Sequence, residues 1–460
     1  MMNQTILKLN RFLMSVSTAM FVHLCASAAV ERVDGIDWYY EVSHGEASLQ
    51  RNGSDPCVAS STTGNVTVPA VLGGCPVTDI GFGAFRGCST ISGVTIASSV
   101  KTIGNYAFSG CAGLQSISLP LGVIKVSQGA FECCTSLTTA SLPSSLEILP
   151  SCMFQDCSNL VSVELSAGLR RIEWSAFEGC AKLADISIPE TVVAIENNVF
   201  RNCPIIQEKA KDGLVIVDNC LLNCSPTRQG ELVLPDGLRV IAGGAFGDGW
   251  TGCSELTSVA IPNTVVSIGE FAFDHCSSVT NLNIPSSVRE IGRGAFIYCR
   301  LPLEVVDGMR IWDGWLLDGN IGQESVALPT GLVGIADEAL SGNYGLKSIE
   351  ISAPNTYFGK GVFASCCDMT NAVITEGVVV IPDSTFEICY GLSNVSLPSS
   401  LRAIGDSAFG SCTGLEEIDI PAGVTNIGSF AFSGCENLVR VVFQGDAPKF
   451  GTKVFNGSEN

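Results

Sequence analysis

The stretch AFSGCAGLQSISLPLGVIKV, residues 107–126, recurs in altered form along most of the chain. Its phenylalanine, Phe108, belongs to a series spaced 23 residues apart, and the cysteine that follows keeps the same spacing. A fixed period of roughly 20 to 50 residues is typical of proteins that stack one small unit on the next. The period therefore predicts one elongated solenoid instead of several globular domains. The phenylalanines that keep this spacing are Phe85, Phe108, Phe131, Phe154, Phe177 and Phe200 before an irregular middle, and Phe363, Phe386, Phe409, Phe432 and Phe455 after it.

Each repeat unit contains three short segments with apolar residues. Polar and apolar residues alternate from Ser116 to Leu119, which predicts a short strand, and Pro120 ends it because proline lacks a backbone donor. Residues 123–126 supply the second segment, and Phe108 lies in the third. One unit cannot bury these groups alone, so neighbouring units must stack. The predicted fold class is mainly β or α/β: a solenoid with a parallel strand in each unit of about 23 residues, and short strands, turns or short helices on the other sides.

The consensus C-x-x-L-x-x-I-x-L-P-x-x-V-x-x-I-G-x-x-A-F resembles the BspA-like type of leucine-rich repeat, which also occurs in treponemal surface proteins. The likeness runs from about Ile80 to Phe455, and residues 33–80 resemble the module that precedes such repeats. The resemblance implies a leucine-rich repeat solenoid at a cell surface or secreted, which binds other proteins or host matrix as an adhesin or surface antigen. It implies no catalytic residues.

The N-terminus has the pattern of a secretory signal. Lys8 and Arg11 precede the mostly apolar residues 12–24, and Ala26-Ser27-Ala28 is a small-residue cleavage site. We expect residues 1–28 to be removed, with no membrane span left afterwards. An uncleaved membrane anchor is the alternative, although polar residues interrupt a stretch that is barely long enough to span.

Two gaps interrupt the repeat. The distance from Phe200 to Phe246 is 46 residues, and from Phe296 to Leu340 it is 44. Each gap contains Asp-Gly, a later Asp, a Leu-Leu pair and a Leu-Pro pair in the same order. We therefore expect modified units with hairpin-like excursions near residues 204–235 and 301–329. The remaining organisation is an N-terminal capping module over residues 29–79 and a solenoid over 80–460.

Two sets of residues are candidates for protein binding. Trp250, Trp312 and Trp315 lie in the irregular units, where they either pack a distorted joint or form a binding hot spot. The outward strand positions are small, polar and mildly acidic, which favours a basic partner. Aromatic platforms for sugars are missing there, so protein is preferred to glycan. The acidic candidates on the strands are Glu164, Asp185, Glu350, Glu417 and Asp419.

The cysteines of the repeat are either bridged or buried as thiols. Asn343 and Ser458 stand at the cysteine position in two units. Either side chain can replace a thiol that hydrogen-bonds to backbone, but neither can replace half of a disulfide, so buried thiols are favoured. Outside the repeat, Cys57 with Cys75 and Cys220 with Cys224 are better candidates for disulfides.

Composition excludes several functions. A formal net charge of −20 disfavours nucleic acid and anionic membranes as partners. No C-x-x-C pair suggests a metal site, and no nucleophile, base or phosphate loop is recognisable, so we expect no enzyme, no metal and no cofactor. The first hypothesis is a secreted or cell-surface protein that mediates protein binding or adhesion. A structural or shielding surface component without a dedicated partner is the second, and an enzyme the third.

Overall fold

The computed structural model describes residues 28–247, 251–352 and 356–458. In these ranges the chain winds into a solenoid whose successive turns pair through parallel strands 23 residues apart, as Ala140 pairs with Ile117 and Val163. This confirms the predicted repeat solenoid. It is mainly β, and the described residues contain one short helix, α2 (Ile205–Glu208). The predicted signal segment lies almost entirely outside the described residues.

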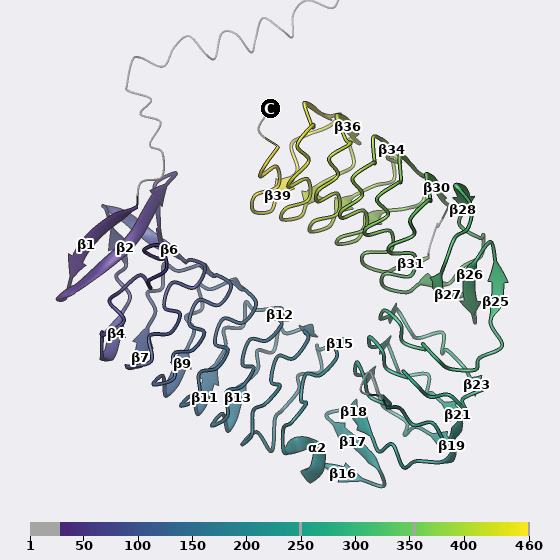
Figure 1. Cartoon of the computed structure of the whole chain (residues 1–460), viewed down its shortest axis with the longest axis horizontal. Coiled ribbons are helices and arrows are strands. Elements are labelled where there is room, and N and C mark those ends of the chain that lie inside the picture. The colour runs from purple at the N-terminus through teal and green to yellow at the C-terminus, as the bar shows by residue number, and fades with distance from the viewer. Residues whose placement is uncertain (1–27, 248–250, 353–355, 459–460) are drawn as a thin grey trace, which may run out of the picture.

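Most units have one strand on the outer, convex side of the solenoid (Figure 1), although residues 183–189 of the unit after β13 form none. These strands alternate buried and exposed residues, as the polar and apolar alternation predicts. They form four parallel sheets. Their bounds are β4 (Gly64–Thr67), β7 (Ile91–Thr95), β9 (Ser116–Ser118), β11 (Thr139–Ser141) and β13 (Ser162–Glu164); β19 (Gly230–Val233), β21 (Leu256–Ala260) and β23 (Asn281–Leu282); β28 (Ser325–Ala327), β30 (Ser348–Ile351), β32 (Asn371–Ile374) and β34 (Asn394–Ser396); and β36 (Glu417–Ile420) and β38 (Arg440–Phe443).

A second, two-residue strand of each unit lies on the inner, concave side. Its second residue, usually isoleucine, faces the core, so its first residue faces the inner surface; Lys125 is exposed while Val126 is buried. We call these the inner strands. They are β8 (Thr102–Ile103), β10 (Lys125–Val126), β12 (Ile148–Leu149), β14 (Arg171–Ile172), β15 (Ala194–Ile195), β20 (Val240–Ile241), β22 (Ser267–Ile268), β24 (Glu290–Ile291), β29 (Gly334–Ile335), β31 (Tyr357–Phe358), β33 (Val380–Ile381), β35 (Ala403–Ile404), β37 (Asn426–Ile427) and β39 (Lys449–Phe450).

The repeat phenylalanines form stacked columns inside the solenoid. Phe85 and Phe108 lie with ring centroids 4.8 Å apart and an interplanar angle of 9°. The column continues to Phe200, a second column joins Phe246, Phe273 and Phe296, and a third runs from Phe363 to Phe455. At the N-terminal end, the buried Trp38 meets Phe85 edge-on at 6.0 Å and closes the column. Trp38 belongs to a module made of β1 (Ala29–Val33), β2 (Ile36–Ser43), β3 (Glu46–Leu49), β5 (Val71–Leu72) and β6 (Cys75–Ile80).

Thiols link neighbouring turns by hydrogen bonds. The Sγ of Cys134 donates to the carbonyl oxygen of Phe108 at 3.2 Å, and the same contact recurs along the repeat. Ser458 Oγ donates to the carbonyl of Phe432 at 3.0 Å in the last unit, where it replaces the thiol. All twenty described cysteines are free, and those of the repeat are buried except Cys299, which is partly buried, so the prediction of buried thiols holds for the repeat with that exception. The disulfides expected for Cys57 with Cys75 and for Cys220 with Cys224 are absent, so that expectation is wrong.

Each gap in the repeat contains an antiparallel hairpin. The first joint comprises α2, β16 (Ala210–Lys211), β17 (Leu214–Val217) and β18 (Cys220–Cys224); the second comprises β25 (Glu304–Val306), β26 (Met309–Trp312) and β27 (Trp315–Gly319). Strand β18 is buried on both faces: Leu222 packs in the N-terminal core and Leu221 in the C-terminal core. The hairpin is therefore a wedge between two cores, which explains its apolar sequence on both faces.

Each hairpin holds the turns before and after it farther apart on the outer side of the solenoid than on the inner side. After β20, Ala242 N donates to Leu221 O at 2.9 Å, and the next residue, Gly243, donates to Ile195 O at 2.8 Å. One turn thus contacts both the hairpin and the unit before it. The second joint repeats this pattern, since Asp337 N donates to Ile291 O at 2.9 Å.

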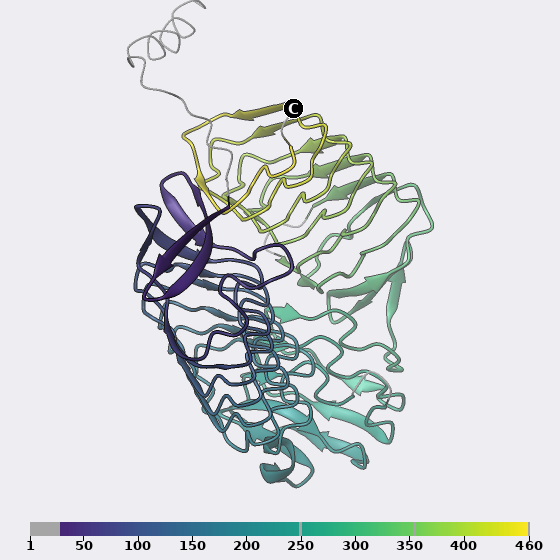
Figure 2. The ribbon, with the colours of Figure 1, turned by 60° about the vertical axis from the view of Figure 1, so that its left-hand side comes forward.

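Because the inner strands stay in contact while the hairpins fill the outer side, the axis of the solenoid bends at both joints. The chain curls into a C, and the C-terminal turns lie opposite the N-terminal module (Figure 1, Figure 2). The inner face is consequently most crowded between the two joints.

Candidate binding site on the inner face

The acidic residues predicted from the sequence lie on the outer side and are not brought together. Glu164, Glu350 and Glu417 are exposed on β13, β30 and β36, which are widely separated in Figure 1. Asp185 is also exposed and pairs with Lys209 at 2.9 Å, but it lies outside any strand, so its expected place on a strand is wrong.

Arg440 forms ion pairs with both Glu417 and Asp419 near the C-terminal end of the solenoid. Its guanidinium lies 2.5 Å from Glu417 and 3.8 Å from Asp419. A basic partner would therefore have to compete with a cation already in place.

The tryptophans pack at the second joint. Trp315 is 2% exposed and stacks on Tyr357, with ring centroids 6.1 Å apart. Trp312 is partly buried and donates its Nε1–H to the carbonyl of Leu282 at 3.0 Å. Trp250 lies outside the described residues. The two described rings thus support the joint and offer little free surface.

The structure instead gathers charged side chains on the inner face between the joints. The surface-facing residues of the inner strands run, in order, through Arg171, Ala194, Val240, Ser267 and Glu290. The three central side chains are small and buried. Small residues at the bend let the long side chains at either end approach each other above them.

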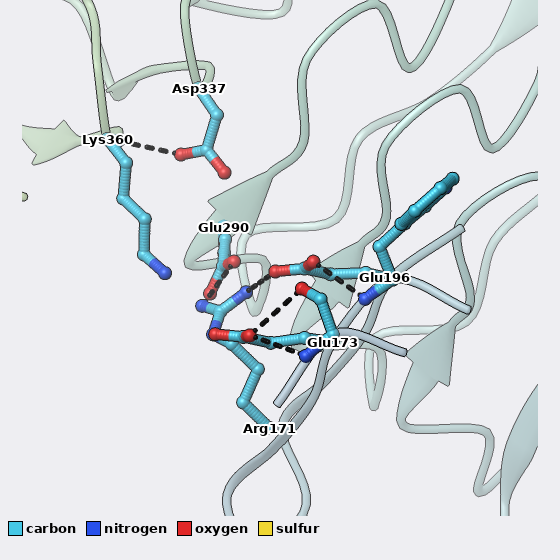
Figure 3. Close-up of polar contacts among 8 residues, drawn as sticks. Arg171, Glu173, Glu196, Glu290, Asp337 and Lys360 are labelled. Carbon is cyan, nitrogen blue, oxygen red and sulfur yellow. Dashed lines mark hydrogen bonds and ion pairs between the residues drawn. The ribbon is translucent and has the colours of Figure 1, made fainter. Parts of the chain in front are cut away.

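Arg171 and Glu290 meet across this bend. Arg171 Nη2 lies 2.7 Å from Glu290 Oε1, and Nη1 lies 3.3 Å from Glu196 Oε1 (Figure 3). The side chain of Arg171 is 14% exposed, and those of the two glutamates are 28% exposed. The ion pairs therefore connect units from both sides of the first joint in a partly desolvated setting, where charge interactions are stronger than at a free surface.

Backbone groups hold the other carboxylates. Glu173 accepts hydrogen bonds from the backbone N–H and the hydroxyl of Ser151 at 3.0 and 3.1 Å. Asp337 accepts from the backbone N–H of Lys360 at 2.8 Å, and the Lys360 side chain extends toward Glu290 (Figure 3). These acids are fixed in orientation by the turns that carry them.

A cavity of about 330 Å³ lies within this cluster. Its lining carries six carboxylates and three cations, so negative charge is in excess. The acids are Glu196, Glu270, Glu290, Asp337, Glu338 and Asp383, and the cations are Arg171, Arg293 and Lys360. A neighbouring cavity of about 470 Å³ shares Glu290, Asp337, Lys360 and Asp383 and adds Tyr357, Phe358 and Val380.

Burial perturbs the carboxylates of the cavity. It raises the pKa of Glu270 to about 7, against the opposing effect of Arg293. It also raises the pKa of Asp337 to about 7, and the nearby Glu290 carboxylate adds to the increase. The pKa of Glu196 is raised for the same reason, although Arg171 counteracts it. For all three carboxylates, the loss of solvation outweighs the effect of the nearby cations.

The site offers charge and hydrogen bonds for binding. Among residues 28–247, 251–352 and 356–458, no group of three His, Cys, Asp or Glu residues is arranged to hold a metal ion. Over the same ranges, the structure contains no helix with the length and apolarity that crossing a membrane requires.

Sequence reasoning missed this cluster because each inner strand contributes only one surface residue per turn. The available signal was a charged or small residue directly before the repeat isoleucine near the gaps, as in Arg171, Ser267 and Gly334. That signal does not show that turns on either side of a joint face each other.

Comparison with known proteins identifies the repeat. A family model described as the BspA type leucine-rich repeat region matches residues 78–207, 215–306, 239–366, 317–387 and 333–460. No curated protein matches the chain.

Solved structures show similar chains. A leucine-rich repeat protein from Bacteroides ovatus is 23% identical, with 94% of this chain and 92% of that chain covered and a TM-score of 0.30. A leucine-rich cell surface protein from Faecalibacterium prausnitzii is 19% identical, with 91% and 96% covered and a TM-score of 0.31. The T. pallidum leucine-rich repeat protein is 23% identical, with 58% and 88% covered and a TM-score of 0.26. The family assignment rests on the sequence match alone.

Proposed function

The chain belongs to the BspA-type leucine-rich repeat family, and we propose that it is an exported, non-catalytic protein that binds another protein through its inner face. The predicted signal segment over residues 1–28 supports export, to the cell surface or the medium. The repeat supports binding because a solenoid offers a long continuous surface instead of an enclosed reaction pocket.

The inner-face cavity is the observation that carries this proposal. Its lining residues come from turns before the first joint, between the joints and after the second, for example Arg171, Glu270 and Lys360. A partner seated there would contact all three segments at once. The acidic outer positions are separated along the solenoid and lack this convergence.

A binding array tests the proposal. The purified mature protein is passed over immobilised extracellular matrix and cell-surface proteins, with surface plasmon resonance as the readout. We expect saturable binding to at least one protein, at about 0.15 M salt. We also expect a Trp174→Ala variant to weaken it, since this 42% exposed residue follows β14 and its backbone N–H donates to Glu196 of the cluster. Absence of saturable binding across the array would refute protein binding as the function.

A fractionation experiment tests export. Cells expressing the full chain should release or display a protein that starts at residue 29, as N-terminal sequencing of the mature form will show. Retention of residues 1–28 in the mature protein would contradict cleavage and favour the anchor.

A further inference from the structure

We propose that the inner-face cavity is a binding site for a basic side chain of the partner protein, a lysine ammonium or an arginine guanidinium. The inference rests on the proposed protein-binding function and names the chemistry of its partner. It draws on the charge balance of the cavity, an unpartnered hydroxyl in its wall, and the size of the space.

Glu270 and Asp337 make no hydrogen bond to a cationic side chain, while Arg293 and Lys360 act on their charges from a greater distance. Arg171 is engaged by Glu196 and Glu290, and Arg293 lies 2.8 Å from Glu338. Glu270 is 3.9 Å from Arg293, beyond hydrogen-bond distance. Asp337 accepts a hydrogen bond from the backbone N–H of Lys360. These two carboxylates retain capacity for a further donor that carries positive charge.

The hydroxyl of Ser267 is an independent indication of a ligand. Ser267 is 3% exposed and lies at the surface-facing position of β22, while its neighbour Ile268 faces the core. Ser267 lines the cavity, and its Oγ has no hydrogen-bond partner among the described residues. Buried hydroxyls are nearly always paired. An ammonium or guanidinium N–H between Glu270 and Glu290 would supply the missing donor.

The dimensions favour one side chain over a larger ligand. A volume of about 330 Å³ is at the lower end of the range for small-molecule sites. The adjoining cavity presents Tyr357, Phe358 and Val380, which suit the apolar stem and the neighbouring residues of a partner segment. A partner segment with a basic residue between apolar residues would fill both cavities, the basic side chain in the smaller one and the apolar residues in the adjoining one.

Binding of a cation should depend on pH in a defined direction. The groups that face the ligand are Glu196, Glu270, Glu290, Asp337, Glu338, Asp383, Arg171, Arg293 and Lys360. The pKa of Glu270 and of Asp337 is raised to about 7, so both are partly protonated at neutral pH in the free protein. A bound cation favours their charged forms and displaces the protons. Affinity should therefore increase as the pH rises from about 6 to about 8.

Calorimetric titration with two capped pentapeptides tests the site. The peptides carry a central arginine or the uncharged isostere citrulline between apolar residues. We expect saturable binding of the arginine peptide, at least tenfold weaker binding of the citrulline peptide, and several-fold tighter arginine binding at about pH 8 than at about pH 6. Equal binding of the two peptides, or no binding of either, would overturn the proposal.

A double variant locates the site. Glu270→Gln with Asp337→Asn removes two charges that burial already disfavours, so the fold should persist, as circular dichroism will verify. We expect at least tenfold weaker binding of the arginine peptide. The matched control is Glu231→Gln with Asp236→Asn, which removes two exposed charges and should bind as the native chain does. Unchanged affinity in the Glu270/Asp337 variant would refute the assignment.

The same variants separate this inference from the proposed function. A protein from the array that binds the native chain and the Glu270/Asp337 variant equally would refute the cation site and leave protein binding standing. If no array protein binds but the arginine peptide binds selectively, the cation site stands and the proposed function falls.

Discussion

Arg171 and Glu290 are 119 residues apart in the sequence, yet their guanidinium and carboxylate groups lie 2.7 Å apart. The contact exists because the side chains between them on the bent row of inner strands, those of Ala194, Val240 and Ser267, are short and buried. Arg171 also pairs with Glu196, so one cation serves two acids from different turns. This arrangement connects the units on both sides of the first joint.

Replacement of Arg171 by alanine should destabilise the protein by roughly 2 kcal/mol. It leaves two partly buried carboxylates without their cation, and such losses exceed those at free surfaces. Urea denaturation at neutral pH measures the change. The control is Arg32→Ala, which breaks an ion pair whose members are 67% and 52% exposed and should cost at most about 0.5 kcal/mol. Equal effects of the two substitutions would mean that the inner pair contributes no special stability.

Glu270 should make stability depend on pH. Its pKa is about 7 in the folded protein and about 4.3 in the unfolded chain. The folded state therefore binds this proton more tightly, and the stabilisation is complete below about pH 4 and lost as the pH rises through about 7. Relative to the native chain, Glu270→Gln should gain stability over that interval. Denaturant titrations at about pH 4, 5.5 and 7.5 measure the difference, and a constant difference would contradict the raised pKa.

The repeat cysteines should remain reduced and unreactive in the folded protein. Burial raises the pKa of Cys88 to about 11 and that of Cys435 to about 12, so little thiolate forms at neutral pH. Thiol titration of the unreduced chain should detect about twenty thiols in denaturant and few without it. Fewer than about six thiols in denaturant would show that the repeat is bridged.

A side chain at Gly334 should destabilise the folded protein. A Cβ at this position would overlap the Trp315 ring, which is stacked on Tyr357 from the next inner strand. Gly334→Ala should therefore cost about 1–3 kcal/mol through overpacking at the second joint. Gly322→Ala is the control, because a Cβ there meets nothing within 4 Å. Thermal denaturation of both variants gives the comparison, and equal melting temperatures would contradict tight packing at Gly334.

Residues equivalent to Phe108 and Cys134 recur at a regular interval in the sequence, and this interval alone predicts that the turns stack. Each apolar position has the same environment in every unit, so a local pattern suffices to predict the parallel strands, the phenylalanine columns and the thiol hydrogen bonds. Asn343 occupies a cysteine position and also donates to the backbone: its Nδ2 hydrogen-bonds to the carbonyls of Gly319 and Leu340.

Only the tertiary structure shows which charged side chains come together on the inner face. Residues 204–235 were expected to deviate, but the sequence does not show that β18 packs against two cores, which bends the axis. That bend places Arg171 beside Glu290 and buries Ser267 beneath the inner face. A repeat fixes the contacts between adjacent turns, which are local. The angle accumulated over many turns depends on two irregular hairpins, so the site they create has no periodic signal in the sequence.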